Sequence, residues 1–201
     1  MALHDYATEL LGNKATIFVL KTLLRYRGKN FTIRDLARNA GISHTEASNV
    51  LRRLGKRGIV RISPIGRAYQ VTLNDESYAL KTIIEPAFLA EERTISSIVS
   101  TLKPFFHNKR GISSVAIFGS VAKGLEKGSS DIDLLVLAQD VELANECVSR
   151  ASTTILGKFG FSLSPSILTK RKLLLKSNEE LKNSILESYI QVCGRELRDV
   201  L

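Results

Sequence analysis

The sequence has few cysteines, no long apolar run and no clustered histidines, and each absence narrows what the protein can be. The two cysteines, Cys147 and Cys193, have no metal-ligand spacing, so we expect buried, reduced thiols rather than a disulfide. No apolar run is long enough to cross a bilayer and no signal-peptide pattern occurs, which favours a cytoplasmic protein without a membrane partner. His4, His44 and His107 are scattered and predict no site.

Charge is unevenly distributed along the chain. Residues 1–74 hold 13 Lys and Arg against 4 Asp and Glu, whereas residues 75–201 hold 16 of each. The whole net charge of +9 therefore lies in the first third of the sequence. This asymmetry predicts a nucleic-acid-binding module joined to a neutral second domain.

Helix signals in the first third predict a helix-turn-helix. A helix capped by Asn13 is expected to run to about Arg27, and Thr32 with Asp35 imitates a capping box for a shorter one. The S-x-x-E sequence that begins at Ser43 is a capping box for the next helix. This last helix has an apolar stripe at helical spacing, formed by Ala47, Val50, Leu51 and Leu54.

The outward face of that helix has small polar groups early and cations late, an order that suits base edges and then phosphates. Two predicted strands, 59–63 and 68–73, flank a turn at 64–67 and form a wing. Residues 1–74 therefore resemble winged helix-turn-helix domains, which implies double-stranded DNA as the partner. A solvated basic face, or a protein or RNA partner, is the alternative. The candidate DNA contacts are Thr45, Ser48, Asn49, Arg52, Arg53, Lys56 and Arg67.

Residues 75–106 are predicted to be a helical connector, broken at Pro86 and Pro104. A helix from Ala87 to Leu102 would have apolar side chains available for packing. Homodimerisation and packing against the second domain are equal alternatives for this helix, since winged helices often read paired half-sites as symmetric dimers.

Residues 119–133, GSVAKGLEKGSSDID, form the most informative motif of the chain. Apolar runs on either side, 115–118 and 134–138, predict two buried strands. Alternate side chains of a strand share a face, so Asp131 and Asp133 should point the same way, roughly 7 Å apart. Two neighbouring carboxylates repel each other, and a divalent cation is the commonest reason to tolerate that.

Three residues of the same motif suit phosphate binding. Gly119 lets the backbone approach a ligand closely, and the Ser120 hydroxyl and neighbouring N–H groups could hold phosphate oxygens. Lys123 lies one helical turn further on as a counter-charge. Together with the two aspartates, these residues predict a site for a metal-bound nucleotide.

The pattern G-S-x-A-K-G, followed by D-I-D at the head of an apolar strand, resembles the nucleotidyltransferase superfamily typified by DNA polymerase beta, in particular its minimal nucleotidyltransferase branch. The resemblance covers roughly residues 95–201 and implies a small α/β fold with a mixed sheet, here assigned to residues 107–201. With the winged helix-turn-helix of residues 1–74, the whole chain is therefore expected to be an α+β protein of two domains. The resemblance also implies that Gly119 and Ser120 contact the triphosphate of an NTP, and that Asp131 and Asp133 are catalytic ligands of Mg²⁺ or Mn²⁺. An ordinary hairpin with two solvated aspartates is the alternative.

One part of the family pattern is missing. The resemblance implies a third carboxylate on a strand beside the D-x-D strand, but the next predicted strand, 160–168, has no acid, and none occurs between Glu146 and Glu179. Glu142 and Glu146 fall on a predicted helix, 141–158. Two carboxylates can bind a metal-nucleotide, since phosphate oxygens and water complete the shell. Two-metal transfer is less well supported, because the attacking and leaving oxygens both need a clamp.

The remaining C-terminal signals are a basic run, 170–172 with Lys176, and a last helix. The basic run fits phosphates, an acidic partner or a solvated patch. A capping box at Ser177 predicts a helix that buries Leu181, Ile185, Tyr189 and Val192.

Three functions follow from these features. A DNA-binding regulator with a nucleotide-binding domain ranks slightly ahead of an active nucleotidyltransferase that acts on a protein, nucleic-acid or small-molecule hydroxyl. An antitoxin-like scaffold that binds a partner ranks third, because the G-S and D-x-D motifs are intact.

Overall fold

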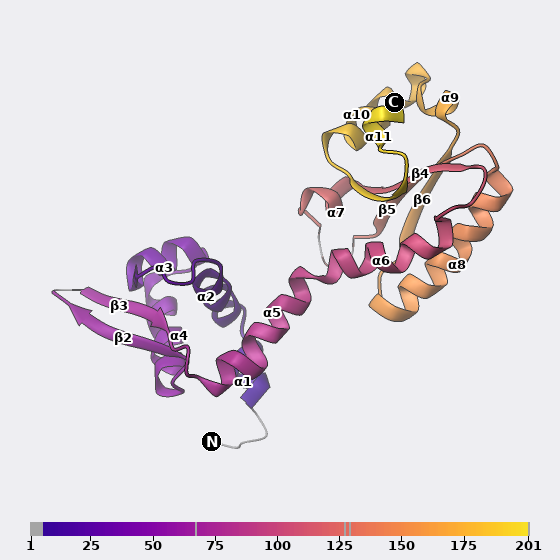
Figure 1. The fold of residues 1–201 in the computed structure, drawn as a ribbon. Coiled ribbons are helices and arrows are strands. Elements are labelled where there is room, and N and C mark those ends of the chain that lie inside the picture. Colours follow the sequence, from indigo (N-terminus) through magenta and orange to yellow (C-terminus); the bar gives the residue numbers. More distant parts are fainter. Residues whose placement is uncertain (1–5, 67, 127, 129, 201) are drawn as a thin grey trace. The chain divides into compact units, whose positions relative to one another are not determined.

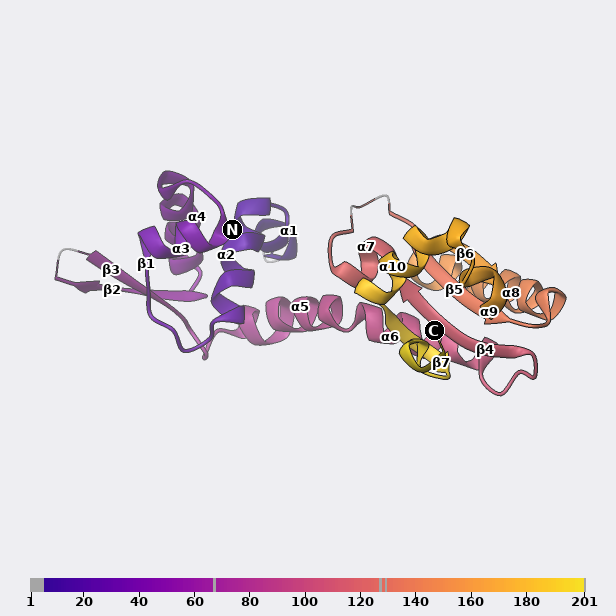
Figure 2. The same cartoon turned by 90° about the horizontal axis from the view of Figure 1, so that it is seen from above.

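The computed structural model describes residues 6–66, 68–126, 128 and 130–200, shown in two views in Figures 1 and 2. The chain forms two compact units, Met1–Arg93 and Thr94–Leu201, and each has a hydrophobic core of its own. Helices and strands occur in both units, which confirms the predicted α+β class with two domains. Within the described residues, no helix is long and apolar enough to cross a membrane.

The first unit combines a group of helices with a three-stranded antiparallel sheet of order β1-β3-β2. Its elements are α1 (Tyr6–Leu11), α2 (Lys14–Arg25), β1 (Phe31–Thr32), α3 (Ile33–Ala40), α4 (His44–Lys56), β2 (Val60–Ile65), β3 (Ala68–Leu73), a π-helical turn η2 (Leu80–Ile84) and α5 (Glu85–Glu92). The short strand β1 pairs with β3, a contact that no local signal predicted.

Side-chain caps define where the helices of this unit begin. Asn13 and Thr32 accept hydrogen bonds from the N–H groups of Thr16 and Asp35, and Ser43 does the same for the third residue of α4. Gly41, at φ +67°, ends α3 in the left-handed conformation that favours glycine. Helices α3 and α4 therefore form the predicted helix-turn-helix, and all four residues of the predicted apolar stripe of α4 are buried.

Strands β2 and β3 form the wing. The pair Ile65↔Ala68 extends β2 two residues beyond the prediction, so Pro64 and Ile65 belong to the strand and the turn is shorter than expected. Arg67 lies outside the described residues. Helix-turn-helix and wing together give this unit winged helix-turn-helix architecture.

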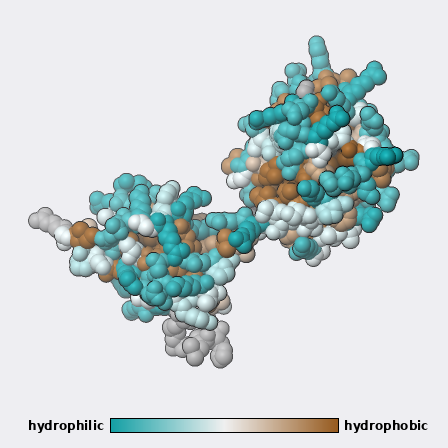
Figure 3. Space-filling model, in the orientation of Figure 1, coloured by the Kyte–Doolittle hydropathy of each residue, from teal (hydrophilic) through white to brown (hydrophobic). Residues whose placement is uncertain are grey.

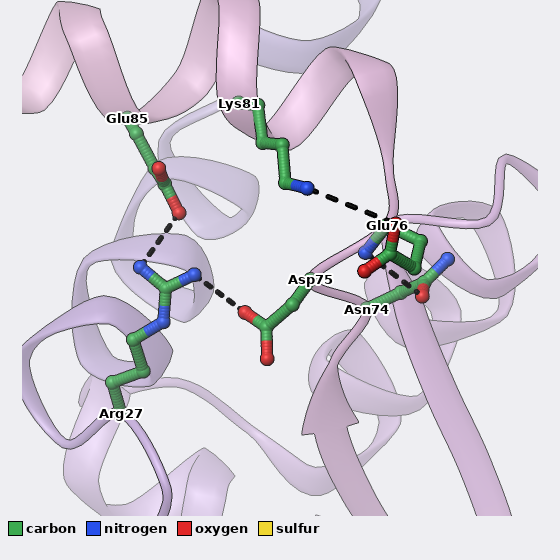
Figure 4. Close-up of polar contacts among 6 residues, drawn as sticks. All are labelled: Arg27, Asn74, Asp75, Glu76, Lys81 and Glu85. Atoms are coloured by element: carbon green, nitrogen blue, oxygen red, sulfur yellow. Dashed lines mark hydrogen bonds and ion pairs between the residues drawn. The ribbon is translucent and has the colours of Figure 1, made fainter.

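The segment predicted as a separate connector, 75–106, is divided between the units. Its first part belongs to the first unit, where Leu80 and Ile84 are fully buried, and its second part begins the second unit as α6 (Thr94–Phe106). Polar contacts also hold the first part in place (Figure 4): the guanidinium of Arg27 donates a hydrogen bond to Asp75 at 2.5 Å and forms an ion pair with Glu85 at 2.8 Å. The hydrogen bond that Arg27 donates to Asp75 is the main cause that raises the pKa of Arg27.

The second unit is built on a four-stranded mixed sheet of order β6-β5-β4-β7. Strands β5 and β6 are parallel, and the other pairs are antiparallel. After α6, its elements are β4 (Ile112–Phe118), α7 (Gly119–Lys123), β5 (Ile132–Ala138), α8 (Val141–Phe159), β6 (Leu163–Leu168), α9 (Lys170–Leu173), a 3₁₀ turn η3 (Lys176–Asn178), α10 (Glu179–Glu187), β7 (Ile190–Gly194) and α11 (Leu197–Val200).

Helices cover both faces of this sheet (Figure 1). Helices α6 and α8 bury one face, to which Ile132 and Leu134 of β5 contribute. Residues of α9, α10 and α11 pack with Leu135 and Leu137 on the other face. Both strand faces are therefore apolar, as the continuous hydrophobic run of β5 indicated. The two cysteines are free and buried, as predicted.

Two helix predictions need correction. The expected helix 87–102 is two helices separated at Arg93, and Pro104 lies inside the last turn of α6 without ending it, where buried Phe106 anchors the helix. The predicted last helix stops at Glu187, and Val192 lies on β7. Pairing of β7 with β4 buries Val192, a long-range contact that helical spacing along the sequence cannot reveal.

Candidate nucleotide site and candidate DNA-binding surface

The turn after β4 brings Gly119 against the carboxylate of Asp133. Phe118, the last residue of β4, pairs with Asp133 of β5, so the chain passes directly beside this aspartate. Gly119 has φ +73°, and a Cβ atom there would lie 2.1 Å from Asp133 Oδ2. A side chain at this position would require the turn or the Asp133 carboxylate to move. The glycine that the sequence assigned to close ligand approach therefore also permits the backbone to approach a candidate metal ligand.

Asp133 and Asp131 interact electrostatically. Asp133 is half-buried, and Asp131 is exposed just before β5. Burial raises the pKa of Asp133, the charge of Asp131 raises it further, and a hydrogen bond from Ser164 opposes both effects. A bound cation would favour the ionised form of both carboxylates, and oxygen donors of this kind suit Mg²⁺ or Mn²⁺.

No third acid completes this pair within the described residues, where no group of three His, Cys, Asp or Glu side chains could hold a metal ion. In the parallel pairing of β5 with β6, the residue beside Asp133 is Ser164. Glu142 and Glu146 lie on α8, as the sequence predicted. The donor set fits one cation that shares its shell with phosphate and water, and it does not supply a three-carboxylate, two-metal centre.

Two further predicted phosphate contacts lie on α7. Ser120 is half-buried in its first turn, and Lys123 is its last residue. The Lys123 ammonium donates to Glu187 at 2.7 Å, and the Ser188 hydroxyl donates to the Ala122 carbonyl at 2.9 Å. The junction of α10 and β7 is thus attached to α7. The sequence missed Glu187, because the helix was expected to continue past it.

The candidate DNA contacts on α4 divide into two groups. Thr45, Asn49, Arg52 and Lys56 are exposed and Ser48 is half-buried, as expected of an outward face. In the described part of the chain, neither Arg52 nor Lys56 has an acidic partner. Arg53 differs, because its guanidinium donates to the Thr16 hydroxyl of α2 at 3.1 Å.

A groove of about 940 Å³ lies between α4, the start of α3 and the wing. Arg34 and Arg52 supply cations, and Ile62 and Tyr69 supply an apolar wall. Tyr69 is 56% exposed and Ile65 is 55% exposed, so hydrophobic side chains reach the surface near the wing tip (Figure 3). This mixture of cations and apolar groups matches the phosphates and sugars of a nucleic-acid backbone.

Comparison with known proteins supports the resemblance of the second unit. The family model described as Polymerase beta, Nucleotidyltransferase matches residues 100–195, the region in which the sequence motif predicted this similarity. No curated protein matches the sequence.

Similar solved structures cover parts of the chain. A toxin-antitoxin crystal structure with AMP-PNP is 21% identical over 53% of this chain and 77% of that chain, with a TM-score of 0.36. The antimony-specific transcriptional repressor AntR is 27% identical over 43% of this chain and 75% of that chain, with a TM-score of 0.36. A MarR family regulator from Silicibacter pomeroyi is 19% identical over 52% and 80%, with a TM-score of 0.33.

Proposed function

We propose that the protein is a DNA-binding regulator whose nucleotidyltransferase domain binds an NTP with a divalent cation. The observation that carries this proposal is the arrangement of Gly119, Asp131 and Asp133 without a third acid in the described residues. This arrangement has the glycine and the two carboxylates of a metal-nucleotide site, but it lacks the third carboxylate that two-metal transfer needs.

Each residue of this site would have a distinct role in binding the metal-nucleotide. Asp131 and Asp133 hold Mg²⁺ or Mn²⁺, which neutralises phosphate charge when bound. The Ser120 hydroxyl donates to a phosphate oxygen, and the absence of a side chain at Gly119 keeps the approach open. Lys123 adds a positive charge, although its ammonium is also paired with Glu187.

The winged helix supplies the second half of the proposal. Exposed Arg52 and Lys56 on α4, with the cations of the groove, would contact double-stranded DNA, consistent with the +9 balance of the first third of the chain. We expect a homodimer, since two-fold symmetric operators are read by paired winged helices. Nucleotide regulates DNA binding only if it binds the DNA-bound and DNA-free forms with different affinity.

Two titrations and one transfer assay test the proposal. Fluorescent NTP is titrated with and without Mg²⁺ or Mn²⁺, DNA affinity is measured in the presence and absence of NTP, and α-labelled NTP is incubated with the protein and a cell lysate. The double variant Asp131→Asn with Asp133→Asn is the control. We expect saturable, metal-dependent binding that the variant loses, a change in DNA affinity, and no transfer.

The other outcomes select the other functions. Label that moves to an acceptor, and does so only with intact aspartates, would make the protein an active nucleotidyltransferase. The intact G-S and D-x-D motifs are what favour this second candidate. Neither binding nor transfer would leave a partner-binding scaffold.

A further inference from the structure

We infer that the hydroxyl of Ser164 is the third protein ligand of the cation, beside Asp131 and Asp133. This inference rests on the proposed cation site. It adds a residue that the sequence motif does not contain, and it assigns that residue to a strand 31 positions further along the chain than Asp133.

The sheet places Ser164 beside Asp133. In the parallel ladder of β5 and β6, Asp133 is in register with Ser164, so their side chains lie on the same face. The Ile132 N–H donates to the Ser162 carbonyl at 2.9 Å, which fixes this register at the site itself. The Ser164 side chain also acts on Asp133, because it lowers the pKa of that carboxyl, which agrees with the neighbouring positions that the register gives the two side chains.

The backbone around Ser164 is suited to holding a ligand. Ser164 precedes Pro165, and the residue before a proline is confined to extended conformations. β6 is an edge strand, where a proline is tolerated and where the side chain of Ser164 is exposed. The hydroxyl is therefore accessible, and the backbone that carries it is confined to an extended conformation.

A hydroxyl ligand differs from a carboxylate ligand in its charge. Serine and threonine hydroxyls ligate Mg²⁺ in other nucleotide sites, but they add no negative charge. With two carboxylates and one neutral oxygen, the protein supplies less negative charge than a three-carboxylate centre, which favours one divalent cation over two closely spaced ones. Ser164 would thus set the capacity of the site at one cation.

The test exchanges the oxygen of this ligand for sulfur. Thiolate prefers soft metals, so Ser164→Cys should lower Mn²⁺ affinity about tenfold and raise Cd²⁺ affinity, whereas the wild type prefers Mn²⁺. Isothermal titration with each metal, in the presence of a non-hydrolysable NTP analogue, gives affinity and stoichiometry. Ser166→Cys is the matched control, because Ser166 lies two residues along the same face of β6 and beside Leu135 instead of an acid.

Two more variants separate ligation from a structural role. Ser164→Thr keeps the hydroxyl and should retain Mn²⁺ affinity, and Ser164→Asp should raise the number of Mn²⁺ ions bound from one to two. Cd²⁺ affinity that is unchanged in Ser164→Cys, or equal in Ser166→Cys, would overturn the inference.

The same titration distinguishes this failure from that of the proposed function. If Asp131→Asn with Asp133→Asn leaves Mn²⁺ binding intact, the cation site itself is wrong. If that variant loses Mn²⁺ and Ser164→Cys behaves as the wild type, only the role of Ser164 is wrong. Thermal melts of each variant show that it is folded under the titration conditions.

Discussion

The two candidate sites differ in how many parts of the chain build them. Most of the candidate DNA contacts lie on one helix, α4, where Arg52 and Lys56 project from an exposed face. The nucleotide site needs β4, α7, β5 and β6 to meet, and a Cβ atom at Gly119 would collide with the Asp133 carboxylate. We therefore expect single changes on α4 to weaken DNA binding in separate steps, and one atom added at the nucleotide site to lower NTP affinity at least about tenfold.

The largest effect is expected from Gly119→Ala. The added Cβ would lie 2.1 Å from Asp133 Oδ2, so either the turn or the carboxylate must move. We expect a lower Tm and at least about a tenfold loss of NTP affinity, since misplaced metal ligands cost about 10–100-fold. Equilibrium dialysis with NTP and Mg²⁺, together with thermal melts, measures both quantities.

Gly124→Ala is the matched control for this variant. Gly124 ends α7 at φ +65°, close to the φ of Gly119, but a Cβ there meets nothing within 4 Å. An alanine at either position has the left-handed backbone cost of about 1–2 kcal/mol, and only Gly119→Ala adds the collision. Equal losses of NTP affinity in the two variants would assign the effect to backbone strain and remove the role given to the Asp133 contact.

On α4, Arg52→Ala should weaken DNA binding by about 1–3 kcal/mol and relax sequence preference, as removal of a base contact does. Lys56→Ala should weaken binding to all sequences and reduce the salt slope by about one. Fluorescence anisotropy at several salt concentrations measures both variants.

Lys81→Ala removes the same charge from η2, where Lys81 pairs with Glu76 at 3.8 Å, and serves as the control. If Arg52→Ala and Lys56→Ala both bind DNA as Lys81→Ala does, α4 is not the DNA-contacting helix.

The difference between contacts within one element and contacts between distant parts of the chain explains which features could be predicted from sequence. Caps at Asn13, Thr32 and Ser43 and the stripe of α4 depend on neighbours three or four residues away, and the structure has them where they were predicted. The strand β7, the ion pair of Lys123 with Glu187 and the pairing of Asp133 with Ser164 join residues that are distant in sequence. Their geometry follows from sheet register, which no local pattern encodes.

Lowering the pH should weaken cation binding at Asp133. The cation needs ionised Asp133, whose pKa is raised by burial and by Asp131. Affinity for Mg²⁺-NTP should be constant well above that pKa and fall about tenfold per pH unit below it, as one proton competes with the metal. The affinity for Mg²⁺-NTP is measured at a series of pH values from about 8 to about 4. A carboxyl with a raised pKa titrates within about this range.

In the cation-free protein, the free energy of unfolding should increase as the pH falls, whereas the cation affinity decreases. With a raised pKa in the folded state, the folded protein binds more protons than the unfolded chain, so this group adds stability as the pH falls through the folded pKa. Asp133→Asn should therefore raise the Tm of the cation-free protein at neutral pH. A lower Tm for this variant would contradict the burial of an ionised carboxylate as the dominant cause.

The smallest effect is expected at the ion pair of Lys123 with Glu187. The pair is partly exposed, with side chains 30% and 68% accessible, and such pairs contribute about 0–1 kcal/mol. Glu187→Gln leaves the Lys123 ammonium free for phosphate, so NTP affinity should rise by up to about fivefold. The rise should vanish in the Lys123→Ala background, because Glu187 then has no lysine to withdraw from the phosphate. Glu180→Gln, an exposed acid in the first turn of the same helix, should leave affinity unchanged. A fall in affinity for Glu187→Gln would mean instead that Glu187 holds Lys123 in the direction that phosphate binding needs.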